Sequence, residues 1–290
     1  MVEAGPVSGY VSVVEFEGLQ SELAAALARL SVVESRVAQQ HSDGRPNVTN
    51  ESSSRGWPRH FGALDLIIYD LETTGIGKTQ DIAMTQIGAV KMRNRGNGDG
   101  WSVVSTWQQH VTPWKALSAG AASVSGLSHK KLEQMKARPC AAVLPEFNAF
   151  IEEDGTRQAV LIGHNAQKYD SRILYHELER SKVSLSPAVM YFGDTLAIFP
   201  HMWPSHNLRS LRLGEIYKTL FPDEAGYRVQ HDALADSQDT AKIFCKLWEE
   251  RDTRGGGDMD DISQMMRARC GSRKLKLLET TSQWQARVGR

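Results

Sequence analysis

The sequence has few cysteines, no long apolar run and no excess of charge of either sign. Its three cysteines, Cys140, Cys245 and Cys270, are widely spaced and form neither a disulfide framework nor a metal-binding pattern. No stretch approaches the length of a membrane span, and the first residues lack the basic-then-apolar order of a signal peptide. These absences predict an intracellular protein of the cytoplasm or nucleus that is not secreted and has no membrane partner.

The charges balance, because Lys and Arg number 34 and Asp and Glu also number 34. Global charge therefore neither favours nor excludes a nucleic-acid partner, and any attraction for a polyanion must be local. Hydrophobic residues make up 41% of the 290 positions, which is ample for a sizeable core. The length fits one large domain with appendages.

An amphipathic helix is predicted within residues 1–40. Apolar side chains between positions 14 and 39 recur at spacings of three and four, which is a heptad a/d stripe. The stripe either forms a coiled coil that makes a homodimer or docks a partner, or it packs on the chain's own domain. Residues 41–60 are rich in Ser, Asn, Gly and Arg and predict a flexible linker.

The folded domain is expected over residues 61–252, where strands and helices follow one another. Five apolar runs predict strands, at 64–69, 81–92, 101–111, 158–164 and 188–196. The first three strands predict an antiparallel meander, and helices alternate with the later strands. This order predicts an α/β domain with a mixed five-stranded sheet flanked by helices. Residues 253–290 are Gly-rich and basic and predict a flexible C-terminal tail.

Two carboxylates stand at the end of the first predicted strand. Asp70 and Glu72 are separated by one residue, so their side chains project from the same face of a strand. Two anions this close repel each other unless a cation lies between them, and hard oxygen ligands favour Mg²⁺ or Mn²⁺. A solvated strand end would show the same pattern, so the pair alone leaves both interpretations open.

Two more acidic positions and a histidine lie further along the chain. Asp170 and Asp236 each fall in the first turn of a predicted helix, and His231 stands just before the second of these helices. Four carboxylates on separate elements suit two divalent cations that act on a phosphodiester. A histidine beside them fits the group that accepts a proton from the attacking water.

Together these segments resemble the three motifs of the DEDDh family, the histidine branch of the 3′-to-5′ exonucleases with a ribonuclease H-like fold. The motif segments are 70–75 (Asp-Leu-Glu-Thr-Thr-Gly), 164–170 and 231–236, and the resemblance covers roughly residues 64–250. It implies hydrolysis of single-stranded DNA or RNA from the 3′ end, with release of nucleoside 5′-monophosphates. The sequence does not distinguish DNA from RNA.

The resemblance also implies roles for single residues. It makes Asp70, Glu72, Asp170 and Asp236 the ligands of two Mg²⁺ or Mn²⁺ ions, with His231 as general base. The implied substrate contacts are Thr73, Thr74, Ile76 and Asn165. Ile76 would stack on the terminal base, although ordinary packing would also explain it. Asn165 would steady a loop near the phosphate, or serve as a turn or cap residue.

A different class of function also fits this chain. A catalytically inactive protein could keep the nuclease fold and act through its N-terminal helix. The intact acidic residues and histidine argue against this alternative, because an inactive homologue is free to lose at least one of them.

Overall fold

The computed structural model describes most of the chain after residue 59. The described residues are 60–96, 100–153, 155, 157–205, 210–227, 231–251, 253, 255–257, 259–270 and 275–289, with the backbone alone at 225–227 and 269–270. One compact unit spans Trp57–Arg290. The predicted N-terminal helix, its dimerisation and the linker up to residue 59 lie outside the described residues.

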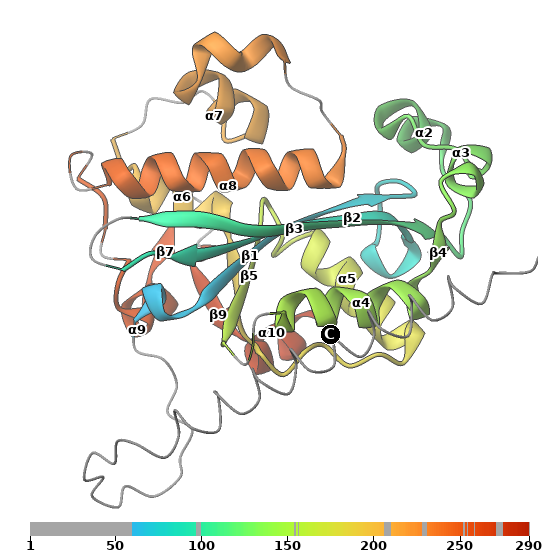
Figure 1. Cartoon of the computed structure of the whole chain (residues 1–290), viewed down its shortest axis with the longest axis horizontal. Helices are drawn as coiled ribbons and strands as arrows, with labels where there is room; N and C mark the ends of the chain where they lie inside the picture. The colour runs from blue at the N-terminus through green and yellow to red at the C-terminus, as the bar shows by residue number, and fades with distance from the viewer. Residues whose placement is uncertain are drawn as a thin grey trace, which may run out of the picture. The chain divides into compact units, whose positions relative to one another are not determined.

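A mixed seven-stranded sheet forms the centre of this unit, with the order β4-β3-β2-β1-β5-β6-β9 (Figure 1). Its strands are β1 (Asp65–Thr73), β2 (Met84–Asn94), β3 (Trp101–Thr112), β4 (Arg138–Pro139), β5 (Ala159–Gly163), β6 (Val189–Asp194) and β9 (Leu278–Thr280). Strands β1, β2 and β3 form an antiparallel meander, whereas β5 runs parallel to both β1 and β6.

The prediction of a mixed α/β sheet flanked by helices is confirmed, but the number of strands is wrong. The five predicted strands are all present, and β4 and β9 extend the sheet at its two edges. These edge strands have two and three residues, which is too short for an apolar pattern to appear. A separate two-stranded ladder joins β7 (Arg269–Cys270) to β8 (Leu275–Lys276).

Helices cover both faces of the sheet (Figure 1). On one face, α6 (Thr195–Met202), α7 (Leu213–Leu220), α8 (Ala233–Glu250) and α9 (Ile262–Arg267) contribute to one apolar core. On the other face, α4 (Cys140–Glu152), α5 (Asp170–Ser181) and α10 (Thr281–Val288) contribute to a second core. The central strands are therefore buried on both sides, which explains their continuous apolar runs.

Shorter elements connect these layers. They are η1 (Phe61–Ala63), η2 (Thr79–Asp81), η3 (Pro222–Tyr227), α2 (Ala119–Ser125) and α3 (His129–Gln134). The side chains of Ser118 and Ser128 cap α2 and α3 by accepting hydrogen bonds from backbone N–H groups. Across the part of the chain that the structure describes, no helix combines the length and apolar character needed to cross a membrane.

Residues 278–288 pair with and pack on the sheet, whereas the sequence predicts a flexible tail over residues 253–290. Strand β9 pairs antiparallel with β6. Helix α10 stacks Trp284 on Phe192, with ring centroids 4.1 Å apart and an interplanar angle of 15°. Leu277, Leu278 and Trp284 are buried. The prediction followed the Gly and basic residues of this segment and missed the few apolar side chains that bind it to the sheet.

Candidate active site

The C-terminal end of β1 carries the first two acidic residues. Strand β5 pairs with β1 only as far as Ile68, so Asp70 and Glu72 lie on the part of β1 that extends beyond its pairing with β5. On its other side β1 stays paired with β2, and the register becomes irregular after Glu72. In α/β sheets, ligands bind beyond the carboxyl ends of parallel strands, which is where these carboxylates lie.

The start of α5 adds the third acidic residue. Asp170 is buried and is the first residue of the helix. The preceding Tyr169 hydrogen-bonds through its hydroxyl to the carbonyl of Gly75 and to Thr73 Oγ1, the latter at 3.2 Å. Tyr169 thus ties the start of α5 to the end of β1.

The start of α8 adds the fourth acidic residue, because the helix approaches β2 very closely. A Cβ atom added at Gly88 would lie 2.2 Å from the backbone nitrogen of Leu234. Ser237 Oγ donates to the carbonyl of Gly88 at 3.1 Å. Gly88 therefore allows the first turn of α8, which contains Asp236, to rest directly on the strand beside Asp70.

Asp232 clamps this end of α8 to the sheet. Its Oδ1 caps the helix by accepting from the N–H of Ala235 at 3.0 Å. Its Oδ2 accepts from Gln86 Nε2 at 2.8 Å and from Gln108 Nε2 at 2.9 Å. Burial opposes ionisation of Asp232, but the hydrogen bonds from Gln86, Ala235 and Gln108 hold its pKa below the usual value. The sequence reasoning missed this residue, because its amide partners lie on β2 and β3, far away in sequence.

The four predicted acidic residues meet in one cluster. Ligand atoms of Glu72, His231 and Asp236 lie within 4.8 Å of one another. Burial raises the pKa of Asp70 well above its usual value, and the charges of Asp170, Asp236 and Glu72 raise it further. Burial likewise raises the pKa of Glu72 and that of Asp170, each to about 7. The cluster thus concentrates negative charge that a divalent cation with oxygen ligands would neutralise.

His231 lies beside Glu72 and Asp236 in this cluster. Its side chain is exposed, its backbone is left-handed with φ of 61°, and its N–H donates to Asp236 Oδ2 at 3.3 Å. Histidine is one of the residues that adopt this conformation more readily than most. The turn therefore keeps the imidazole beside the acidic residues without burying it.

The predicted substrate contacts differ in how they are placed. Ile76 is 99% exposed, so the ordinary-packing interpretation of this residue is wrong. Thr74 is buried and braces the turn, because its hydroxyl accepts from Ala83 N at 3.0 Å and its carbonyl accepts from Ser118 N at 2.8 Å. Thr73 is half-buried and shares its hydroxyl with Tyr169.

Asn165 lies in a left-handed turn between β5 and α5, with φ of 62°. Its N–H donates to Asp194 Oδ1 at 3.0 Å, while its buried side-chain oxygen has no hydrogen-bond partner among the residues that the structure describes. This position agrees with the interpretation of Asn165 as a turn residue. Its side-chain oxygen is still available to accept a hydrogen bond.

Comparison with known proteins identifies the same segments. Residues 67–244 match the exonuclease family RNase_T. Ribonuclease T of Yersinia enterocolitica is 27% identical over 201 residues, which cover 66% of this chain and 87% of that protein. DNA polymerase III subunit epsilon of Rickettsia felis is 29% identical over 196 residues, which cover 64% of this chain and 75% of that protein.

A solved structure shares the fold. Exonuclease I of Escherichia coli, in a complex with single-stranded DNA, matches with a TM-score of 0.51 and 18% sequence identity. The match covers 66% of this chain and 41% of that one, so the chain spans less than half the length of exonuclease I.

The family match agrees with the resemblance found in the sequence. The matched residues take in Asp70 and Glu72 at the end of β1, Asp170 at the start of α5, and His231 and Asp236 at the start of α8. Because the match covers well over half of the chain and includes all three acidic segments, the chain belongs to the RNase T family of exonucleases.

Proposed function

We propose that the protein is a metal-dependent 3′-to-5′ exonuclease that releases nucleoside 5′-monophosphates from single-stranded ends. The observation that carries this proposal is the meeting of four carboxylates from β1, α5 and α8 with His231. The raised pKa values of Glu72 and Asp170 support it, since they reflect burial of these carboxyls close to other acids. Such a cluster is unfavourable in the absence of a cation.

The carboxylates of Asp70, Glu72, Asp170 and Asp236 fit two Mg²⁺ or Mn²⁺ ions, because all four donors are hard oxygens. Bound there, such ions supply stabilisation of negative charge on the attacking and leaving oxygens of the phosphodiester. His231 accepts the proton of the attacking water on a ring nitrogen, and its exposure lets it pass that proton to solvent.

The substrate end is held by residues around the acidic cluster. Ile76 offers an exposed apolar side chain one residue after Gly75, on which the terminal base stacks. Thr73 and Asn165 supply polar groups for the terminal nucleotide, and Thr74 holds the turn that presents them. Discrimination between DNA and RNA depends on contacts to the 2′ position of the sugar. The relatives include a ribonuclease by name and a DNA polymerase subunit, so both substrates need testing.

Digestion of matched DNA and RNA strands tests the proposal. Strands of one sequence carry a 5′ label and either a free or a blocked 3′ end. We expect the free strands alone to shorten stepwise from the 3′ end, with Mg²⁺ or Mn²⁺ required and EDTA inhibiting.

Asp70→Asn should abolish this cleavage, while Asp223→Asn, an exposed control outside the cluster, should not. Cleavage in EDTA, or equal cleavage by Asp70→Asn, would contradict the metal assignment. A metal-binding wild type that cuts neither DNA nor RNA would instead favour the inactive interaction protein.

A further inference from the structure

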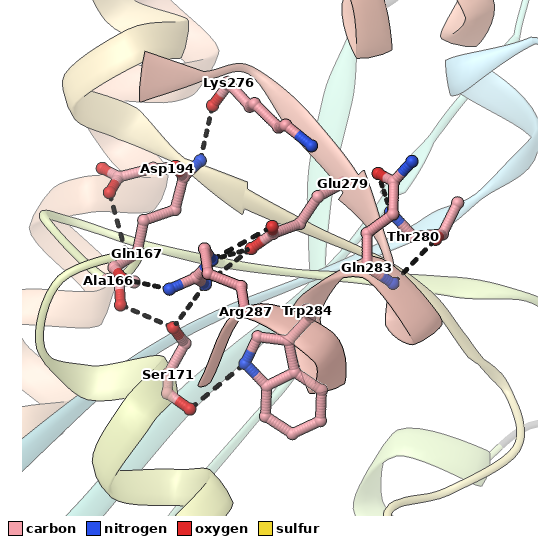
Figure 2. A network of polar contacts seen from close by, with 10 residues as sticks. All are labelled: Ala166, Gln167, Ser171, Asp194, Lys276, Glu279, Thr280, Gln283, Trp284 and Arg287. Atoms are coloured by element: carbon pink, nitrogen blue, oxygen red, sulfur yellow. Dashed lines mark hydrogen bonds and ion pairs between the residues drawn. The ribbon is translucent and has the colours of Figure 1, made fainter. Parts of the chain in front are cut away.

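The last described segment of the chain is attached to the turn that carries Asp170. We call residues 275–288 the C-terminal strap; it contains β8, β9 and α10. The strap lies beyond residue 244, where the family match ends. Figure 2 shows how its side chains meet the segment 166–171 at the start of α5.

Before Asp170, the strap binds Gln167 at two points. Arg287 Nη1 donates to the backbone carbonyl of Gln167. The side-chain amide of Gln167 donates in turn to the carbonyl of Lys276 at 2.6 Å. Gln167 is therefore held through both its backbone and its side chain.

After Asp170, the strap binds the next residue of α5. Arg287 Nη2 lies 3.3 Å from Ser171 Oγ, and Trp284 Nε1 donates to the carbonyl of Ser171 at 3.2 Å. Ser171 Oγ itself donates to the carbonyl of Ala166 at 2.7 Å. The backbone on both sides of Asp170 is thus fixed by side chains of α10 (Figure 2).

A buried ion pair holds Arg287 in this position. The guanidinium contacts both carboxylate oxygens of Glu279, with its shortest contact at 2.6 Å, and the Glu279 side chain is 1% exposed. A buried carboxylate that loses its partner is strongly destabilising, so the pair keeps Arg287 oriented. Asp194 supports the same turn from the sheet, where it accepts from the N–H groups of Asn165 and Gln167.

We infer that Arg287 is a positioning residue of the active site, which holds Asp170 in the geometry needed to bind the divalent cation. This inference rests on the proposed function, because it takes Asp170 as a metal ligand. Residues that orient a ligand from outside the coordination sphere typically contribute about 10- to 100-fold to metal affinity. The site would then be incomplete within residues 67–244, although that segment contains all four acidic residues.

Mn²⁺ binding to the full chain tests the inference without nucleic acid. Free Mn²⁺ is measured by electron paramagnetic resonance for the wild type, Arg287→Gln and Arg287→Lys, well below the Tm of each protein. We expect both variants to lower Mn²⁺ affinity about tenfold or more. Lysine keeps the charge opposite Glu279, so this variant should still fold. A single ammonium, however, cannot reproduce the contacts to Glu279, Gln167 and Ser171 together.

Arg93→Gln is the matched control. Arg93 also pairs with a buried carboxylate, Asp65, but at the start of β1, away from the acidic cluster. The Mn²⁺ affinity of Arg93→Gln should stay within about threefold of the wild-type affinity, even if the substitution lowers Tm. Unchanged Mn²⁺ affinity in both Arg287 variants would overturn the inference, as would a wild type that binds no Mn²⁺. A wild type that binds Mn²⁺ but cuts no strand would contradict the proposed function and leave the inference to be judged by the binding data.

Discussion

At the scale of single residues, the acidic cluster makes the metal-free protein sensitive to pH. Burial raises the pKa of Glu72 and of Asp170 to about 7, whereas both carboxyls ionise near pH 4 in an unfolded chain. Between these values the folded protein binds more protons than the unfolded chain, so its stability must fall as pH rises.

The first prediction follows for Tm in EDTA. We expect the wild-type Tm to fall between pH 5 and pH 7.5 through these ionisations. Glu72→Gln should raise Tm at pH 7.5 and change it little at pH 5, because the Glu72 carboxyl, with its pKa raised to about 7, is largely neutral at pH 5 and largely ionised at pH 7.5. Adding Mg²⁺ at pH 7.5 should stabilise the wild type but not Asp70→Asn. Asp223→Asn is the control, and an equal Tm gain in that variant would show that the effect is not specific to the cluster.

The second prediction concerns His231 as the proton acceptor. His231→Asn should reduce kcat by about 10²- to 10⁴-fold, the usual contribution of a positioned general base. Asparagine tolerates the left-handed backbone at this position, so the turn should be preserved and Mn²⁺ affinity unchanged. His129→Asn, on the exposed face of α3, serves as the control. A loss of kcat below about threefold would mean that another group takes the proton.

At the scale of elements, the position of α8 depends on two contacts with the sheet. Gly88 permits the close approach of the helix, and Asp232 joins its first turn to Gln86 and Gln108. Both contacts act on the element that carries His231 and Asp236. The geometry of the acidic cluster therefore depends on packing between β2 and α8 as well as on the acidic residues themselves.

The third prediction tests the close approach. In Gly88→Ala the added methyl must displace α8, so we expect a loss of about 1–3 kcal/mol or more in the free energy of unfolding and a loss of nuclease activity. Gly120→Ala is the control, because a Cβ at Gly120 meets nothing within 4 Å beyond its chain neighbours and the backbone of its own helix. Urea denaturation and the cleavage assay measure both effects. Wild-type activity in Gly88→Ala would show that the cluster tolerates movement of α8.

The fourth prediction separates the two roles of Asp232. Asp232→Ser can still cap α8 but cannot accept hydrogen bonds from both glutamine amides, whereas Asp232→Ala loses both functions. The helix cap alone is worth about 1 kcal/mol. We expect urea denaturation to give a lower free energy of unfolding for the serine variant than for the wild type. The alanine variant should lose about 1 kcal/mol more, because it also lacks the helix cap. Equal stability of the serine variant and the wild type would mean that the glutamine contacts contribute nothing.

Some parts of the fold and of the candidate site were predictable from the sequence, and others were not. Apolar runs mark the strands β1, β2, β5 and β6, so these strands were predictable. Asp70 and Glu72 end one such run, and Asp170 and Asp236 lie in the first turns of predicted helices, so the acidic residues were predictable too.

The hydrogen bonds from Gln86 and Gln108 to Asp232 were not predictable, because Asp232 is 146 residues from Gln86 and 124 from Gln108 in the sequence. The strap was also missed, since β9 has three residues and its surroundings are basic. Contacts of this kind arise from the tertiary fold and leave no local pattern.

At the scale of the whole molecule, the compact unit Trp57–Arg290 extends to the C-terminus. The fifth prediction is that residues 57–290 fold alone, with the Tm and activity of the full chain. If residues 1–40 pair two chains, light scattering should give twice the monomer mass for the full chain and the monomer mass for the truncated one. A monomer in both cases would contradict the coiled coil. A truncated chain that is unfolded would contradict the proposed boundary.

The strap follows all four acidic residues in the sequence, and this order has a consequence for biosynthesis. A protein leaves the ribosome N-terminus first and begins to fold during synthesis. All four acidic residues of the nascent chain are synthesised before the strap emerges. The turn that carries Asp170 therefore at first lacks the hydrogen bonds from Arg287 and Trp284. We expect nuclease activity to appear only once the strap has left the ribosome, so a nascent chain that ends before residue 275 should not cut the nucleic acid near it.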